Sequence, residues 1–246
     1  MGDTMNDSLH ASRRRAVLAV AGLLAAAEPE RGASDLALGP WYLRVGGRFA
    51  GPVARVVSSD HPLGTCTLEL GAATAAGMSG MIDSALAGAP AREDLTLFRG
   101  GTRGILGLEL SGARVTALAL PRLDAARLGE PVVQVRIAWR GRSVSRLPDS
   151  FVVATEPPAA DDPPALAVRV DGQPVPVVSV GPWSSGAGDL TLAVAEGGTG
   201  LEPGEPRAVT VAIGRFTFTF AGRLEAVRAP VFTLAVERAV LQVTPA

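Results

Sequence analysis

The residue types that a serine hydrolase uses occur together once, in the run Ser58-Ser59-Asp60-His61. Serine, histidine and aspartate act as nucleophile, general base and orienting carboxylate when side chains from separate places converge. Adjacent residues on one turn rarely point at a common atom, so this run predicts a polar loop. His10 lies in the first 35 residues, which leaves His61 as the only histidine of the remaining chain.

Two glycine-containing runs resemble catalytic or nucleotide-binding motifs but fail on spacing. Gly77-Met78-Ser79-Gly80-Met81 begins like a nucleophile elbow, yet Met81 stands where the second glycine belongs and the run has a helical pattern. Gly198-Thr199-Gly200 lacks the third spaced glycine of a dinucleotide loop and has Pro203 at that place. Turn formation explains the second run better.

Metal ligands are equally scarce. One cysteine, Cys66, and one histidine cannot supply the usual zinc sets. Cys66 lies in the alternating run TCTLEL, which predicts a buried small hydrophobic residue. Asp161-Asp162 stands among prolines and is typical of a solvated linker. The sequence therefore predicts no catalytic residue, no cofactor and no metal site, and hence a protein that is not an enzyme.

The composition points to a folded chain with a sizeable core. The 246 residues are 47% hydrophobic and 19% charged, enough to bury one large core or two small ones. The net charge of -1 and the pI of about 6.2 give no basic footprint for nucleic acid. All 23 cations are arginine, which we attribute to a GC-rich genome.

The first 35 residues differ from the rest. Arg13 and Arg14 lie in a basic start that is followed by apolar residues to Ala27, a pattern that resembles a twin-arginine export signal. The apolar stretch of about a dozen residues falls short of the roughly 20 that span a bilayer, so no membrane span is expected. We expect residues 1–35 to form a leader, with an Ala-rich disordered tail as the alternative.

From Leu36 onward, short alternating runs between Gly and Pro predict a mainly β fold, a sandwich or barrel. One helix is expected, because Met78, Met81, Ile82, Ala85 and Leu86 fall at helical spacing, with Thr74 as its cap and Gly88 as its stop. The expected strands are 41–45, 52–57, 65–70, 95–99, 105–110, 114–120 and 132–139. In the last of these, Val133, Val135, Ile137 and Trp139 share one face.

A Pro-rich segment divides the chain. Residues 154–165 hold four prolines and two aspartates without apolar periodicity, which is typical of an interdomain linker. We expect a first β domain at 36–150, a linker at 151–165 and a second, smaller β domain at 166–246. The second domain is expected to be a reduced repeat without the helix, because Leu43-Arg44-Val45-Gly46-Gly47 is echoed by Val168-Arg169-Val170-Asp171-Gly172. Phe216, Phe218 and Phe220 share a face of an added strand.

Residues 36–145 resemble the phage T4-type tail-tube family of contractile tails and extracellular injection systems. The resemblance includes an opening hairpin at 41–57, a helix at 76–86 and, most specifically, a corner formed by Leu120, Pro121, Leu123, Asp124 and Ala125 between two strands. The helix departs from the family pattern because it has no large aromatic anchor. The match therefore fits a divergent member.

The resemblance implies a barrel-like subunit that joins copies of itself, and other tail or injection-system proteins, in rings stacked as a hollow tube. Such a protein assembles in the cytoplasm or forms part of a virion or injection particle. The alternative is an exported two-domain β-sandwich binding or surface module, for which the leader at Arg13 and Arg14 is the main support. Its aromatic content of 4% is low for a sugar-binding platform.

Overall fold

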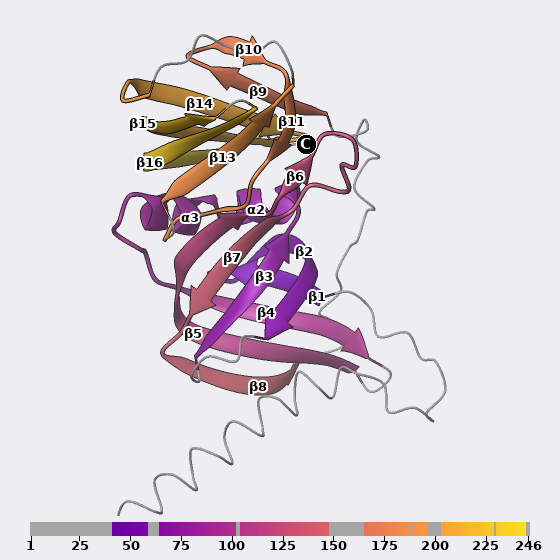
Figure 1. The fold of residues 1–246 in the computed structure, drawn as a ribbon. Helices are drawn as coiled ribbons and strands as arrows, with labels where there is room; N and C mark the ends of the chain where they lie inside the picture. Colours follow the sequence, from indigo (N-terminus) through magenta and orange to yellow (C-terminus); the bar gives the residue numbers. More distant parts are fainter. Residues whose placement is uncertain are drawn as a thin grey trace, which may run out of the picture.

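The computed structural model describes residues 41–58, 64–101, 104–147, 165–186, 188–195, 203–228 and 230–244. Within these ranges the chain forms many strands and two short helices, which confirms the mainly β fold class (Figure 1). The expected leader with Arg13 and Arg14, the linker up to residue 164, His61, Asp161-Asp162 and Gly198-Thr199-Gly200 lie outside the described residues.

The first half forms a closed six-stranded barrel, in which β5 pairs with both β4 and β7. The strand order around the barrel is β5-β4-β1-β2-β3-β7. Beyond the closure, β8 pairs with the first part of β5 and forms a three-stranded extension with β4. The strands are β1 (Trp41–Val45), β2 (Arg48–Ser58), β3 (Thr65–Leu70), β4 (Glu93–Gly101), β5 (Gly104–Leu120), β7 (Val133–Ala138) and β8 (Gly141–Leu147).

The alternation of apolar and polar residues explains why these segments form strands. The expected face of β7 is confirmed, because Val133, Val135 and Ile137 are completely buried and the residues between them are half-buried. The strands expected at 105–110 and 114–120 are in fact one strand, β5. A bulge lies where Gly112 adopts a φ of 57°, and it lets the chain bend without ending the strand.

The expected helix is two helices, α2 (Ala72–Gly77) and α3 (Ser79–Leu86), separated at Met78. Gly77 lies at the break, where a side chain would collide with Ala50. The expectation that Thr74 caps the helix is wrong, because Gly71 is the N-cap and Thr74 is buried with its hydroxyl donating to the Pro52 carbonyl, 2.5 Å away. Gly88, with a φ of 77°, does follow the C-terminus of α3.

The second half forms a sheet in the order β10-β9-β14-β15-β16-β13-β11-β6. Only Pro176 separates β10, at one end of this path, from β11, which lies next to β6 at the other end, so the chain itself links the first strand of the path to the last strand of the second half. We call this half the second barrel. Its strands are β9 (Leu166–Val170), β10 (Gln173–Val175), β11 (Val177–Val180), β12 (Trp183–Ser184), β13 (Asp189–Val194), β14 (Pro206–Ile213), β15 (Phe216–Arg228) and β16 (Val231–Val243), while β6 (Leu123–Asp124) comes from the first half.

The two halves share one strand order. Each strand of the first barrel has a counterpart with the corresponding pairings in the second barrel. The counterparts are β9 for β1, β10 with β11 for β2, β13 for β3, β14 for β4, β15 for β5, and β16 for β7 with β8. Both opening hairpins turn through two residues with positive φ, at Gly46-Gly47 and at Asp171-Gly172. No helix occurs in the described residues of the second half.

Two register shifts of the first barrel have counterparts in the second, although the shifts in β1–β2 and β4–β5 have none. The β2–β3 pairing shifts register between Val53 and Arg55, and the β11–β13 pairing shifts between Val177 and Ser179. Likewise β5 against β7 shifts between Val115 and Ala117, while β15 against β16 shifts between Leu224 and Ala226. Because bulges are specific local features of a sheet, their coincidence relates the two barrels residue by residue.

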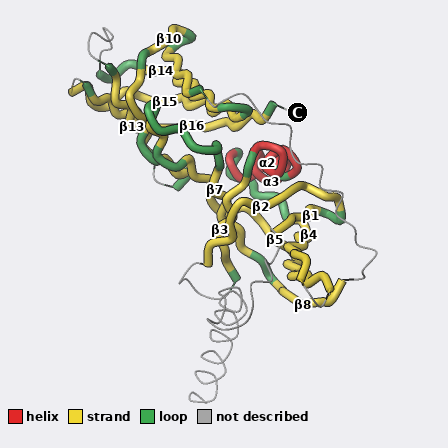
Figure 2. Tube along the Cα trace, turned by 90° about the vertical axis from the view of Figure 1, so that its right-hand side faces the viewer, coloured by secondary structure: helices red, strands yellow, loops and turns green. Residues whose placement is uncertain are grey.

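The two helices lie between the barrels (Figures 1 and 2). Met78, Met81 and Ile82 are buried and belong to a hydrophobic cluster that extends from the first barrel into the second. On the other side, α2 and α3 contact β16. The expected aromatic face is present, since Phe216, Phe218 and Phe220 are all buried. The apolar core is therefore continuous through both halves.

Candidate functional site

The corner singled out by sequence lies where the two barrels meet. Leu120, the last residue of β5, pairs with Trp183 of β12, and Leu123 of β6 pairs with Val180 of β11. Each half therefore contributes a two-residue strand to the sheet of the other half. The residues between these pairs are Pro121-Arg122 on one side and Gly181-Pro182 on the other.

Local chemistry fixes the turn after β6. The Asp124 carboxylate accepts from the Ala126 amide at 3.0 Å, and the Asp124 carbonyl accepts from the Arg127 amide at 3.0 Å. Aspartate commonly closes turns of this kind through its own side chain. The Ala125 amide donates to the Val178 carbonyl of the other half at 3.0 Å. Thus Leu120, Leu123, Asp124 and Ala125 all pair across the junction or hold its turn.

Proline accounts for the end of β5. Pro121 has no amide hydrogen to donate to a ladder, so the strand ends at Leu120 and the chain turns toward the second barrel. A proline also lies at the junction in the second half, where Pro182 directly precedes Trp183. Sequence reasoning missed this second corner, Val180-Gly181-Pro182-Trp183. A Gly-Pro pair after an apolar run was the available signal.

Two side chains secure the junction. The Ser185 hydroxyl accepts from the Leu118 amide at 3.1 Å, and the Ser185 amide donates to the Leu118 carbonyl at 2.9 Å. Trp183 is 4% exposed and meets the Phe220 ring edge-on, with the ring centroids 4.9 Å apart. Among the described residues the buried Trp183 Nε1 has no acceptor. Trp183 therefore stabilises the junction through packing.

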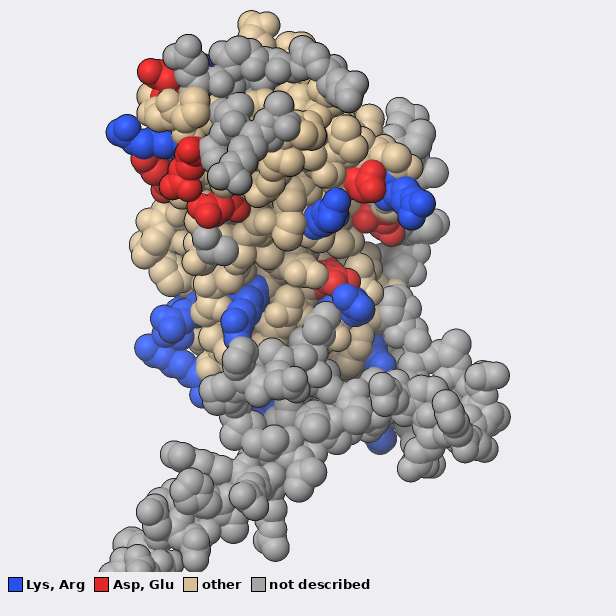
Figure 3. Space-filling view, viewed as in Figure 1, with Lys and Arg blue, Asp and Glu red and all other residues tan. Residues whose placement is uncertain are grey.

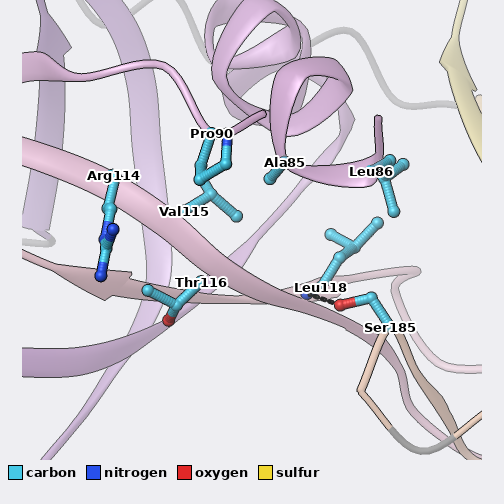
Figure 4. A pocket seen from close by; sticks show the side chains of 8 residues that line it. All are labelled: Ala85, Leu86, Pro90, Arg114, Val115, Thr116, Leu118 and Ser185. Carbon is cyan, nitrogen blue, oxygen red and sulfur yellow. Dashed lines mark hydrogen bonds between the residues drawn. The ribbon is translucent and has the colours of Figure 1, made fainter. Parts of the chain in front are cut away.

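A cavity of about 350 Å³ lies beside the junction (Figure 4). Its walls come from the end of α3, from β5 and from the β12 side of the other half. Leu86 and Ala85 form an apolar wall, and Ser185 bonds to Leu118 rather than projecting freely. Among the described residues that line the cavity, Arg114 is the one ionisable side chain, so this described lining holds no acid–base pair.

Three arginines gather around the Gly112 bulge. The Arg92 guanidinium donates to the Gly112 carbonyl at 2.8 Å, and the side chain of Arg140 lies against the same glycine. Partial desolvation, together with the charges of Arg140 and Arg114, lowers the pKa of Arg92. The Asp94 carboxylate accepts from the Gly112 amide at 2.8 Å and brings a negative charge to the same bulge.

The remaining sequence candidates lie apart. Ser58 ends β2, Ser79 begins α3, and Cys66 is buried in β3, where burial raises the pKa of the thiol to about 12. Within the described ranges no three His, Cys, Asp or Glu residues are grouped so as to hold a metal ion. In the same ranges no helix has the length and apolarity to cross a membrane.

Comparison with known proteins adds no family to this picture. No protein-family model matches the chain, and no curated protein matches it significantly. The described residues show two barrels of one topology that exchange short strands at a shared corner.

Proposed function

We propose that the protein is a structural, tube-like component of a phage tail or contractile injection system, which assembles into rings. The observation that carries this proposal is the presence of two barrels with the same strand order and two register shifts in common in one chain. A module that packs on a second copy of itself within the chain is suited to pack on further copies between chains. The corner between β5 and β7 agrees with the family resemblance of residues 36–145.

The way the barrels are joined favours a ring of three chains. Contacts between different faces of related subunits generate a ring when the rotation closes. Here the helix-bearing end of the first barrel meets a different surface of the second barrel, so the contact within the chain is already head to tail. The family resemblance implies a ring of six barrels, which three chains of two barrels each would supply.

Exposed apolar side chains support assembly. Leu106 and Val144 are each about half exposed, and β8 pairs on one side only in the described residues. An open strand edge beside exposed apolar residues favours association with another chain.

The test is electron microscopy of the purified full chain at high concentration, with mass photometry of the same sample. Rings with a central hole and the mass of three chains are the expected result. A monomer at every concentration, with no ring in the presence of candidate tail proteins, would contradict the proposal and favour the exported binding module.

A further inference from the structure

Among the described residues, none covers one face of the first barrel, whereas the counterpart of this face in the second barrel is covered. In the first barrel, Leu108 of β5 pairs with Val144 of β8, and in the second barrel Phe218 of β15 pairs with Leu241 of β16. The neighbouring pairs Leu110–Arg142 and Phe220–Ala239 keep the same spacing. Leu106, Leu108 and Val144 therefore correspond to Phe216, Phe218 and Leu241. We call the first set the open face.

Exposure differs sharply between the two sets. Leu106 is 52% exposed and Val144 is 50% exposed, whereas Phe216 is 0% and Leu241 is 6% exposed. The helices of the first barrel cover the face of the second barrel that contains Leu241, since Ala75, Ile82 and Leu241 line one crevice. The second barrel therefore shows how a face that corresponds to the open face is buried against a neighbouring barrel.

The rims of the two surfaces differ in charge. Around the open face stand Arg99, Arg142 and Arg146, and the corresponding positions in the second barrel are Ile213, Ala239 and Val243. Arg142 and Arg146 are exposed, and Arg99 lies over the Trp41 ring at 5.0 Å. In Figure 3 arginine side chains gather over the first barrel, while acidic side chains gather at the left of the second. The occupant of the open face should therefore combine an apolar centre with acidic groups.

The second barrel offers exposed acidic groups at its free end. In the first barrel, Thr116 is the bulge residue of β5 and lines the cavity beside α3, and Glu225 holds the same bulge position in β15. Glu205, immediately before β14, lies next to it, because the Leu224 amide donates to the Glu205 carbonyl. Both glutamates are exposed. This end of the second barrel corresponds to the helix-bearing end of the first.

We propose that the open face of one chain binds the end of the second barrel of another chain, around Glu205 and Glu225. Within one chain, the counterpart of the open face in the second barrel packs against the helix-bearing end of the first barrel. The proposed contact joins the two corresponding surfaces between chains. Arg142 and Arg146 face the glutamates in it, and Leu106 and Val144 become buried. The inference rests on the proposed ring and names the surface that closes it.

The first experiment changes one apolar residue on each of two surfaces. Val144→Asp removes an apolar contact from the open face, and its carboxylate would pair with Arg142 and Arg146 in place of the glutamates, so it should reduce assembly at least tenfold by mass photometry. Val178→Asp is the matched control, since Val178 is 52% exposed and lies on β11, whereas the open face is formed by β5 and β8 and the two glutamates belong to β15 and to the residue before β14. It should assemble like the parent chain.

A charge exchange provides the second experiment. Arg142→Glu with Arg146→Glu should abolish rings, Glu205→Arg with Glu225→Arg should do the same, and an equimolar mixture of the two variants should restore them. Circular dichroism of each variant checks that the fold is retained, since all four side chains are exposed.

The outcomes separate the surface from the function. Rings that persist in Val144→Asp and in both charge variants would overturn the surface and leave the ring proposal standing. Absence of rings in the parent chain would overturn both. Loss of rings in the charge variants without recovery on mixing would place another occupant, such as residues 1–35 or a different protein, on the open face and contradict the proposal.

Discussion

Leu120 and Trp183 pair across the boundary between the two halves of the chain, so a residue of the second half completes the edge of a strand in the first. Leu123 and Val180 make the reverse pairing a few residues away. Because backbone ladders run in both directions across the boundary, we expect the two halves to unfold together.

Trp183 should be the main packing residue of this junction. Trp183→Ala is expected to lower the free energy of unfolding by about 3–5 kcal/mol, because a large buried side chain is replaced by a cavity. Trp183→Phe should cost clearly less, since the indole N–H lost in that variant has no described acceptor. Urea denaturation followed by circular dichroism measures both. Equal losses for the two variants would show that the N–H is bonded after all.

Thr74 should stabilise the contact between α2 and β2 through its hydroxyl. Thr74→Val removes the donor to the Pro52 carbonyl in a buried place and should cost about 1–3 kcal/mol of unfolding free energy. Thr74→Ser keeps the hydroxyl and should retain more of the stability. Thermal melts of the three proteins decide the matter, and a serine variant as weak as the valine variant would point to the methyl group instead.

Gly222 should resist substitution because of its neighbour across the sheet. A Cβ atom at this position would overlap the Ala235 carbonyl, and backbone atoms cannot move aside as a side chain can. Gly222→Ala should therefore destabilise the chain by about 1–3 kcal/mol. Gly129→Ala is the control, because nothing lies within reach of a Cβ there. A small effect at both positions would mean that β15 and β16 can separate at low cost.

Asp171 should contribute stability that depends on pH. The Ala208 amide, and then Arg207, bond to its carboxylate and lower its pKa. A carboxyl with a lower pKa in the folded state stabilises that state above its unfolded pKa, and this contribution disappears as the pH falls through the folded pKa. Asp171→Asn should therefore be less stable than the parent at pH 6, and the difference should shrink toward pH 2. Urea titrations at several pH values test this, and a difference that is constant with pH would exclude the ionic contribution.

Cys66 should be unreactive in the folded chain. Its pKa of about 12 keeps the thiol protonated, and only the thiolate reacts with disulfide reagents. We expect labelling by a disulfide reagent at pH 8 to proceed only in urea. Since the thiol of the unfolded chain ionises near its ordinary pKa of 9.0, stability should also fall as the pH rises from 9 toward 12. Rapid labelling without urea would show that β3 opens.

The alternation of apolar and polar residues and the turn residues were enough to predict most strands of the first half and the relation between the two halves, but not β8 or the continuity of β5. The Leu43–Val45 run and its echo at Val168–Val170 do begin barrels of one topology. Thr74 was misassigned because a threonine near a helix start is usually a cap, and its carbonyl partner at Pro52 is distant in sequence. The corner at Leu120–Ala125 was recognised, but its partner at Val180–Trp183 was not, because a two-residue strand has no periodicity to detect.

The pairing of Leu118 with Ser185 joins residues that are 67 positions apart. At roughly 5–20 residues per second of synthesis, the ribosome needs about 3–13 seconds to add the later residue after the earlier one. During that interval the nascent first barrel has an uncompleted edge at β5 and uncovered helices. A chaperone that binds apolar surfaces would have its opportunity then, and a pause in translation after residue 147 should increase the yield of aggregated chain.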